Sequence, residues 1–170
     1  MLYDTIVETG AALVEKYGTR DPFRIAKEIG IRVKFVDGFS TLKGCYQIIL
    51  RNRWIFINSN LRPSMRRIVC AHEIGHDQLH RRMVDGGRSM MEFELYDMKN
   101  RPEYEANIFA SELLLDTDEI LDYIYNYRYD VQQIAAIMKS DVNLVALKIS
   151  TLTKDGYQLR IPDYKNNFLK

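Results

Sequence analysis

Residues 66–80 read RRIVCAHEIGHDQLH, and within them His72, Glu73 and His76 form the pattern HExxH. On an α-helix, side chains four residues apart project from one face about 6 Å apart. Two imidazoles so placed can direct a ring nitrogen at the same Zn²⁺ ion. Glu73 can then lie beside the metal without binding it, take a proton from zinc-bound water and pass it to a leaving amine. The pattern therefore predicts the helix of a zinc hydrolase.

The residues on either side predict a long, buried helix around this pattern. Pro63 suits a first helical turn, no proline follows before residue 85, and Gly86-Gly87 is a stop signal. Gly75 inside the helix costs about 1 kcal/mol relative to alanine. We interpret it as either a close approach of another backbone to the metal side or ordinary tight packing. The apolar positions of the helix are Ile68, Val69, Ala71, Ile74 and Leu79.

The length and composition predict one compact domain with a sizeable core. Across 170 residues, 24 Lys and Arg against 23 Asp and Glu leave a net charge of +1. This balance gives no electrostatic reason to expect nucleic acid or an anionic membrane as the main partner. No apolar run approaches the roughly 18 residues of a membrane span, and the N-terminus lacks the basic and apolar regions of a signal peptide. Cys45 and Cys70 form no C-x-x-C pattern, which favours a reducing cytoplasm.

Two helices and then a small sheet are predicted before residue 63. Gly18 and Gly30 end the two helical patterns, after which the period changes to that of half-buried strands. We predict an α+β fold in which a small, mainly antiparallel three-stranded sheet packs on a zincin-type helical core. The expected elements are helices 2–17 and 22–29 and strands 31–36, 45–50 and 54–57.

A second helix, expected over residues 103–115, offers the third metal ligand. Catalytic zinc sites keep three protein ligands and leave one position for water. Glu103 and Asn107 are four residues apart and share a face, so Glu103 can bind the metal while Asn107 holds the other nitrogen of a ligand histidine. Glu105 is rotated by about 200° from Glu103, so both cannot bind from one regular helix. Glu103 is favoured and Glu105 remains the alternative. Carboxylates in a first helical turn are also favoured by the helix dipole alone.

His80 follows His76 by four residues and stays near the same helix face. Three ligands spread over eight residues of a straight helix span about 12 Å, which is too far for one metal. We therefore expect His80 to cap the helix or to orient a ligand rather than to bind the metal. Residues 81–98 lack one clear period and are expected to be mostly loop near the site; the Met90-Met91 pair within them is expected to fill the core.

The C-terminal part reads as three further helices. Asp116 begins an acidic helix start, and the tyrosines at 123, 125, 127 and 129 predict a packing surface between helices. Residues 130–140 and 141–152 resemble a helix-turn-helix. The second of these offers Lys148 and few other groups for reading DNA, so we expect packing or protein recognition there. The predicted division is a core at 1–115, a helical region at 116–153 and a tail at 154–170.

The chain resembles the ImmA/IrrE metallopeptidases. The resemblance rests on HEIGHxxLH at 72–80, on ExEANxFAxxLL at 103–114 and on the order of the predicted elements. It implies one zinc ion per chain bound by His72, His76 and a glutamate of the second motif, with Glu73 as the general base. Related gluzincins place the ligand four residues before an Asp or Asn, which favours Glu103 and leaves Glu105 open.

The resemblance also implies a role in regulated proteolysis. Members of the family cut a repressor of the helix-turn-helix type and thereby release genes of a phage, an integrative element or a stress response. The small size is more similar to the mobile-element ImmA branch, with the C-terminal helices helping to grip the repressor. The rival hypothesis is a non-catalytic regulator, an anti-repressor that binds the repressor without cutting it. The oligomeric state is not predicted.

Overall fold

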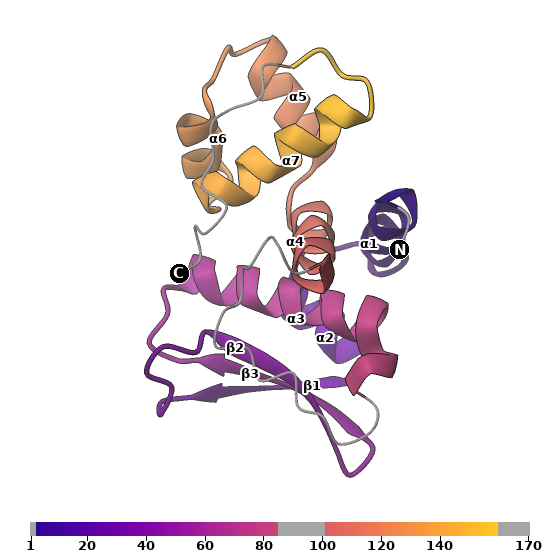
Figure 1. Ribbon diagram of the computed structural model, residues 1–170. Coiled ribbons are helices and arrows are strands. Elements are labelled where there is room, and N and C mark those ends of the chain that lie inside the picture. The colour runs from indigo at the N-terminus through magenta and orange to yellow at the C-terminus, as the bar shows by residue number, and fades with distance from the viewer. Residues whose placement is uncertain (1–2, 85–100, 160–170) are drawn as a thin grey trace.

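The helices and the sheet lie in successive layers (Figure 1), in a computed structural model that describes residues 3–84 and 101–159. Helix α3 (Pro63–Val84) crosses one face of the three-stranded sheet. Helix α4 (Arg101–Leu114) packs on the other side of α3, beside the first helix, α1 (Tyr3–Tyr17). The C-terminal helices lie farthest from the sheet. This arrangement buries α3 between the sheet and α4, as expected for a helix that carries a metal site.

The two N-terminal helices are confirmed. Helix α1 ends before Gly18, which adopts a φ of +59°. Helix α2 (Pro22–Glu28) begins after Asp21, whose side chain accepts a hydrogen bond from the backbone N–H of Phe23 and so caps the first turn. Gly30, with a φ of +77°, then turns the chain into the sheet.

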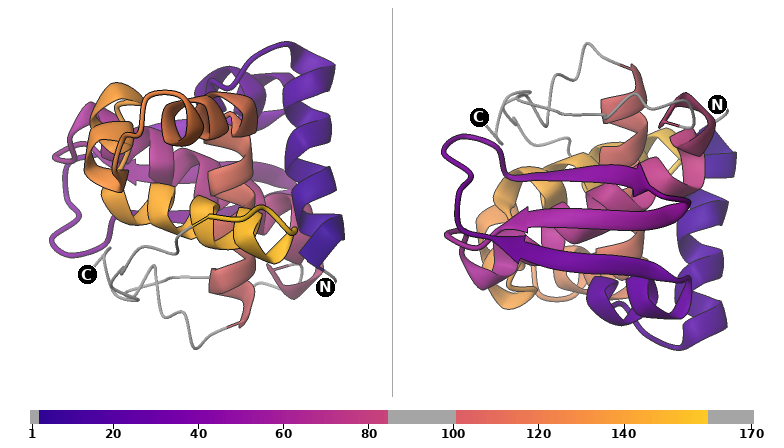
Figure 2. Two further views of the ribbon diagram at one scale, coloured as in Figure 1. Left: turned by 90° about the horizontal axis from the view of Figure 1, so that it is seen from above. Right: turned by 90° about the horizontal axis from the view of Figure 1, so that it is seen from below.

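The α+β fold with its three-stranded sheet is also confirmed, and the sheet is mixed. Strands β1 (Ile31–Val36), β2 (Gly44–Ile49) and β3 (Asn52–Asn58) lie in the order β1-β3-β2. The expected antiparallel pairing holds for β2 and β3, whereas β1 pairs with β3 in parallel. The connection after β1 passes over the central position of the sheet, so β2 forms the opposite edge. The hairpin between β2 and β3 then places β3 in the centre, between β1 and β2. The right-hand view of Figure 2 shows the sheet from the side opposite α3.

The turn between β2 and β3 lies earlier than residues 51–53. Leu50 and Arg51 form a two-residue connection, with φ values of +49° and +62°. Two successive residues with positive φ characterise a turn whose twist matches that of a hairpin, for which Asn and Gly are the usual residues. Leu50 and Arg51 carry no such signal, so the pattern of the strands alone did not locate the turn.

Helices α3 and α4 approach each other closely at Gly75. A Cβ atom added to Gly75 would lie 3.2 Å from the Cα atom of Ala106 and 3.3 Å from its carbonyl oxygen. The close backbone approach considered for Gly75 is therefore present. Helix α3 continues through residues 81–84, which were expected to belong to a loop; the rest of that loop, with Gly86-Gly87 and Met90-Met91, lies outside the described residues.

Helices α5 (Thr117–Tyr125), α6 (Val131–Ile137) and α7 (Val142–Lys154) enclose a second hydrophobic cluster. Each begins with an aspartate cap, and these caps are Asp116, Asp130 and Asp141. The cluster also takes in Ile68 of α3, so these helices pack on the core of the molecule. The rings of Tyr123, Tyr127 and Tyr129 lie 5.4 to 6.1 Å apart, in α5 and the loop that follows it. Tyr125 and Tyr127 are exposed, so only some tyrosines of this group take part in packing.

Candidate metal centre

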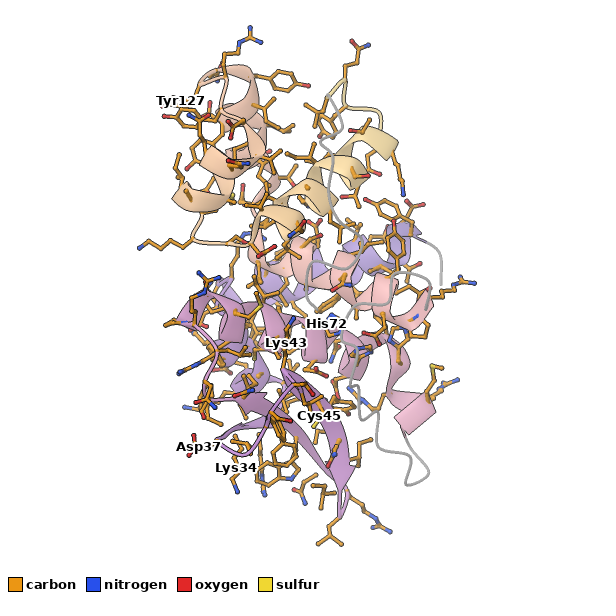
Figure 3. All side chains as sticks on the ribbon, turned by 60° about the vertical axis from the view of Figure 1, so that its left-hand side comes forward. Lys34, Asp37, Lys43, Cys45, His72 and Tyr127 are labelled. Carbon is orange, nitrogen blue, oxygen red and sulfur yellow. The ribbon has the colours of Figure 1, made fainter. Side chains whose placement is uncertain are left out.

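Three buried side chains from α3 and α4 converge at the centre of the molecule. The Nε2 atom of His72 lies 2.9 Å from Nε2 of His76 and 3.1 Å from a carboxylate oxygen of Glu103. The other oxygen of Glu103 lies 3.2 Å from Nε2 of His76. Figure 3 places His72 in the interior, between the sheet and the C-terminal region, in which Tyr127 is labelled. The helical spacing of the histidines and the crossing of α4 over Gly75 together produce this convergence.

The donor set fits a divalent metal ion. Two imidazole nitrogens and one carboxylate oxygen are the protein ligands of many catalytic zinc sites. The Nδ1 atom of His72 lies 3.0 Å from Oδ1 of Asn107, an oxygen that can only accept a hydrogen bond. Nδ1 of His72 therefore carries the proton, and Nε2 directs a lone pair at Glu103. One ligand atom from each of the three residues can be chosen so that all lie within 4.8 Å of one another, and a cation among them would relieve the repulsion between their lone pairs.

Glu73 lies beside this group and differs from Glu103 in its surroundings. Its side chain is buried, and its carboxylate accepts a hydrogen bond from the backbone N–H of Tyr46 in β2. Among the described residues, its Oε1 atom has no hydrogen-bond partner. Burial raises the pKa of Glu73 to about 7, against the opposing charge of His76 and with a further contribution from Glu103. A carboxylate with such a pKa can both accept and release a proton near neutral pH.

His80 and Glu105 lie next to the three converging residues without joining them. Nδ1 of His80 lies 3.1 Å from Nδ1 of His76, and Nε2 of His80 lies 2.9 Å from Oε2 of Glu105. The metal-binding geometry found among the described residues includes Glu103 and not Glu105. The expected contact between Asn107 and a ring nitrogen of a histidine is present as well.

The sequence analysis missed Asp77, which attaches α3 to the sheet. Its fully buried carboxylate accepts hydrogen bonds from the Tyr46 hydroxyl at 2.6 Å and from Arg53 at 2.9 Å. The partly exposed side chain of Arg81 donates a third hydrogen bond to this carboxylate, at 2.7 Å. Its one signal in the sequence is its position directly after His76, on the side of α3 that turns toward the sheet.

Gly44 in β2 was also missed. A Cβ atom at this position would lie 2.4 Å from Cγ1 of Val69 and 3.4 Å from Oε1 of Glu73. Strand β2 therefore runs directly against α3 beside the carboxylate. A glycine within a strand signals a close approach of another element, and no motif of the sequence indicates which element that is.

Residues 26–150 match the family model of the IrrE N-terminal-like domain, a family of metallopeptidases. The chain belongs to this ImmA/IrrE family, as its two motifs predicted. One relative, named uncharacterized immunity region protein 2 of Bacillus phage phi105, is 36% identical over 146 residues, which are 86% of this chain and 90% of the relative. The metallopeptidase ImmA of Bacillus subtilis strain 168 is 33% identical over 104 residues, 58% of this chain and 56% of that protein. Among the described residues, no helix has the length and apolar character that crossing a membrane requires.

Proposed function

We propose that this protein is a zinc-dependent endopeptidase that cleaves a transcriptional repressor of the helix-turn-helix type. In this proposal His72, His76 and Glu103 hold one zinc ion and Glu73 is the general base. The observation that carries the proposal is the convergence of three buried ligand atoms beside a buried carboxylate with a raised pKa. The membership in a metallopeptidase family supports it.

The chemistry of the proposal divides between the metal and Glu73. A bound zinc ion supplies a Lewis acid that polarises the scissile carbonyl and lowers the pKa of water toward about 7. Glu73, with its free Oε1 atom, takes a proton from the attacking water and passes it to the leaving amine. In the metal-free site, burial raises the pKa of Glu73 to about 7, so this carboxyl group can hold a proton near neutral pH. Asn107 holds the ring of His72 so that Nε2 faces the site.

The name of a relative and the surroundings of Lys148 support the proposed substrate. A relative that matches over 86% of this chain is named for an immunity region of a phage, and this name supports a regulatory protein as the substrate. A role in which the protein itself binds DNA finds no support in α7, because Lys148 is 2% exposed and forms an ion pair with Glu112. We place the reaction in the cytoplasm, where such a repressor acts. Residues 1–115 would form the catalytic core, and residues 116–153 would contact the repressor.

The direct test is cleavage of a purified helix-turn-helix repressor from the same phage or mobile element. The wild-type protein, loaded with zinc, should convert the repressor to fragments whose masses identify one cut site. Glu73→Gln should retain zinc and leave the repressor intact. The matched control is Glu8→Gln on the exposed surface of α1, which should cleave like the wild type. Cleavage by Glu73→Gln at the wild-type rate would contradict the proposed role of Glu73.

A second function is favoured by exposed aromatic side chains at the end of α5. Tyr125 and Tyr127 are 43% and 56% exposed, a surface that suits binding to another protein. The protein would then act as an anti-repressor that binds without cutting. A reporter gene under the repressor separates the two functions: derepression by Glu73→Gln supports binding alone, and loss of derepression supports cleavage.

A further inference from the structure

A chain of hydrogen bonds leads from His76 through His80 and Glu105 to the surface at Arg101. Nδ1 of His76 lies 3.1 Å from Nδ1 of His80, and Nε2 of His80 lies 2.9 Å from Oε2 of Glu105. The other oxygen of Glu105 accepts a hydrogen bond of 2.9 Å from Nε of Arg101. The side chains of His76, His80 and Glu105 are at most 8% exposed, whereas that of Arg101 is 72% exposed. The chain thus connects a buried imidazole to a charge at the surface.

The donors and acceptors of these side chains fix the direction in which each hydrogen bond of the series is donated. The carboxylate of Glu105, paired with Arg101, can only accept hydrogen bonds, so Nε2 of His80 carries a proton. In a neutral imidazole the second nitrogen is then an acceptor, so Nδ1 of His80 accepts. Nδ1 of His76 must therefore donate, which leaves the lone pair of its Nε2 atom directed at Glu103. This is the tautomer that a metal ligand binding through Nε2 requires.

We propose that His80 and Glu105 are positioning residues that hold His76 in its metal-binding tautomer and orientation, although neither binds the metal. This inference rests on the proposed function, since it takes His76 as a zinc ligand. The two histidines of the motif are then held differently. His72 donates to one neutral amide, that of Asn107, and His76 donates through a second imidazole to a carboxylate. Partners of this kind raise the basicity of a ligand ring, and their loss typically lowers metal affinity about 10- to 100-fold.

The first experiment measures the tautomers in the metal-free protein. The chain contains three histidines, so long-range ¹H–¹⁵N correlation spectra should show three imidazole patterns, to be assigned with His80→Phe. At neutral pH, His76 should carry its proton on Nδ1 and His80 on Nε2. Glu105→Gln should preserve this pattern, because the amide oxygen can still accept from His80, and Glu105→Leu should abolish it. A proton on Nε2 of His76 in the wild type would overturn the inference.

The second experiment measures zinc affinity by competition with a chelator. Glu105→Leu and His80→Phe should each bind zinc about 10- to 100-fold more weakly than the wild type, and Glu105→Gln should lie much closer to it. The matched control is Glu8→Gln, which removes an exposed carboxylate of α1. It should bind zinc like the wild type. Equal affinity in Glu105→Leu and the wild type would contradict the inference.

Both measurements omit the substrate, so the inference and the proposed function can fail separately. Glu105-dependent zinc binding in a protein that cleaves no repressor would sustain the inference and refute the peptidase. If cleavage depends on Glu73 while Glu105→Leu binds zinc as tightly as the wild type, the proposed function is sustained and the inference is refuted. Circular dichroism of each variant shows whether it is folded, and the wild-type tautomers need no variant at all.

Discussion

Gly75 of α3 lies against the backbone of Ala106 in α4, so closely that a side chain at position 75 would be crowded. A Cβ atom there would be 3.2 Å from the Cα atom of Ala106 and 3.1 Å from a ring carbon of Phe109. Because His76 follows Gly75 and Asn107 follows Ala106, this contact sets the separation of the two helices at the metal centre. The conformational cost of a glycine inside a helix is therefore offset by the approach of Glu103 and Asn107 to the histidines.

Replacement of Gly75 by valine should weaken both folding and metal binding. The added side chain would meet the backbone of Ala106, which cannot move aside as a flexible side chain would. Overpacking of this kind costs about 1 to 3 kcal/mol. Urea unfolding of the metal-free protein measures the loss, and chelator competition measures the fall in zinc affinity. Gly38→Val is the control, because a Cβ atom there has no neighbour within 4 Å. Unchanged zinc affinity in Gly75→Val would show that the helices can separate without harm to the site.

Asp77 should contribute more to stability than any exposed carboxylate. Asp77→Ala would remove the acceptor of the buried Tyr46 hydroxyl and the carboxylate partner of Arg53, which keeps only the carbonyl oxygen of Ile29 as an acceptor among the described residues. Removal of one partner from a buried charged pair costs about 3 to 5 kcal/mol. The contact with Arg81 adds little because that side chain is 46% exposed. Urea unfolding should show this loss for Asp77→Ala and almost none for Glu8→Ala on the exposed side of α1. A loss below about 1 kcal/mol would mean that water replaces the lost acceptor.

The metal-free protein should lose stability through Glu73 as the pH rises. The pKa of Glu73 is raised by burial from 4.5 to about 7, so between these values the folded state binds the proton and the unfolded state does not. The free energy of unfolding therefore falls across this pH range, and the loss is complete above pH 7. Glu73→Gln removes the loss, and should be more stable than the wild type by up to about 3 kcal/mol at pH 8 and by far less at pH 5.

Urea unfolding of both chelator-treated proteins at pH 5, 6, 7 and 8 tests this prediction. The difference between the two proteins isolates Glu73 because the other titrating groups are common to both. A difference that stays constant with pH would show that Glu73 titrates near its ordinary value in the folded state.

The ion pair between Lys148 and Glu112 should behave as a structural link between α7 and α4. Lys148 is 2% exposed, so Lys148→Met would leave the carboxylate of Glu112 mostly buried and without this partner. The single variants should be destabilised by about 3 to 5 kcal/mol, and the double variant Lys148→Met with Glu112→Leu should recover much of this. A double-mutant cycle by urea unfolding measures the coupling. Independent, additive losses would contradict the link.

Local signals in the sequence predicted the elements and the two histidines of the site. The cap at Asp116 acts on the backbone N–H of Glu119, three residues away, and the spacing of His72 and His76 follows from the pitch of one helix. Such features involve neighbours in the chain. They need no knowledge of the rest of the fold, and for this reason they were predictable.

Only the tertiary structure decided which side chains of α4 face those histidines. The spacing to Asn107 favoured Glu103 and left Glu105 as the alternative, and the crossing of α4 over Gly75 brings Glu103 to His72 and Glu105 to His80. The same holds for the parallel pairing of β1 with β3. The sequence by itself determined the helices, the family and the HExxH motif, because these depend on short-range geometry. The metal-centre geometry and its supporting hydrogen bonds depend on how separate elements pack, and that is set by the contacts of the whole core.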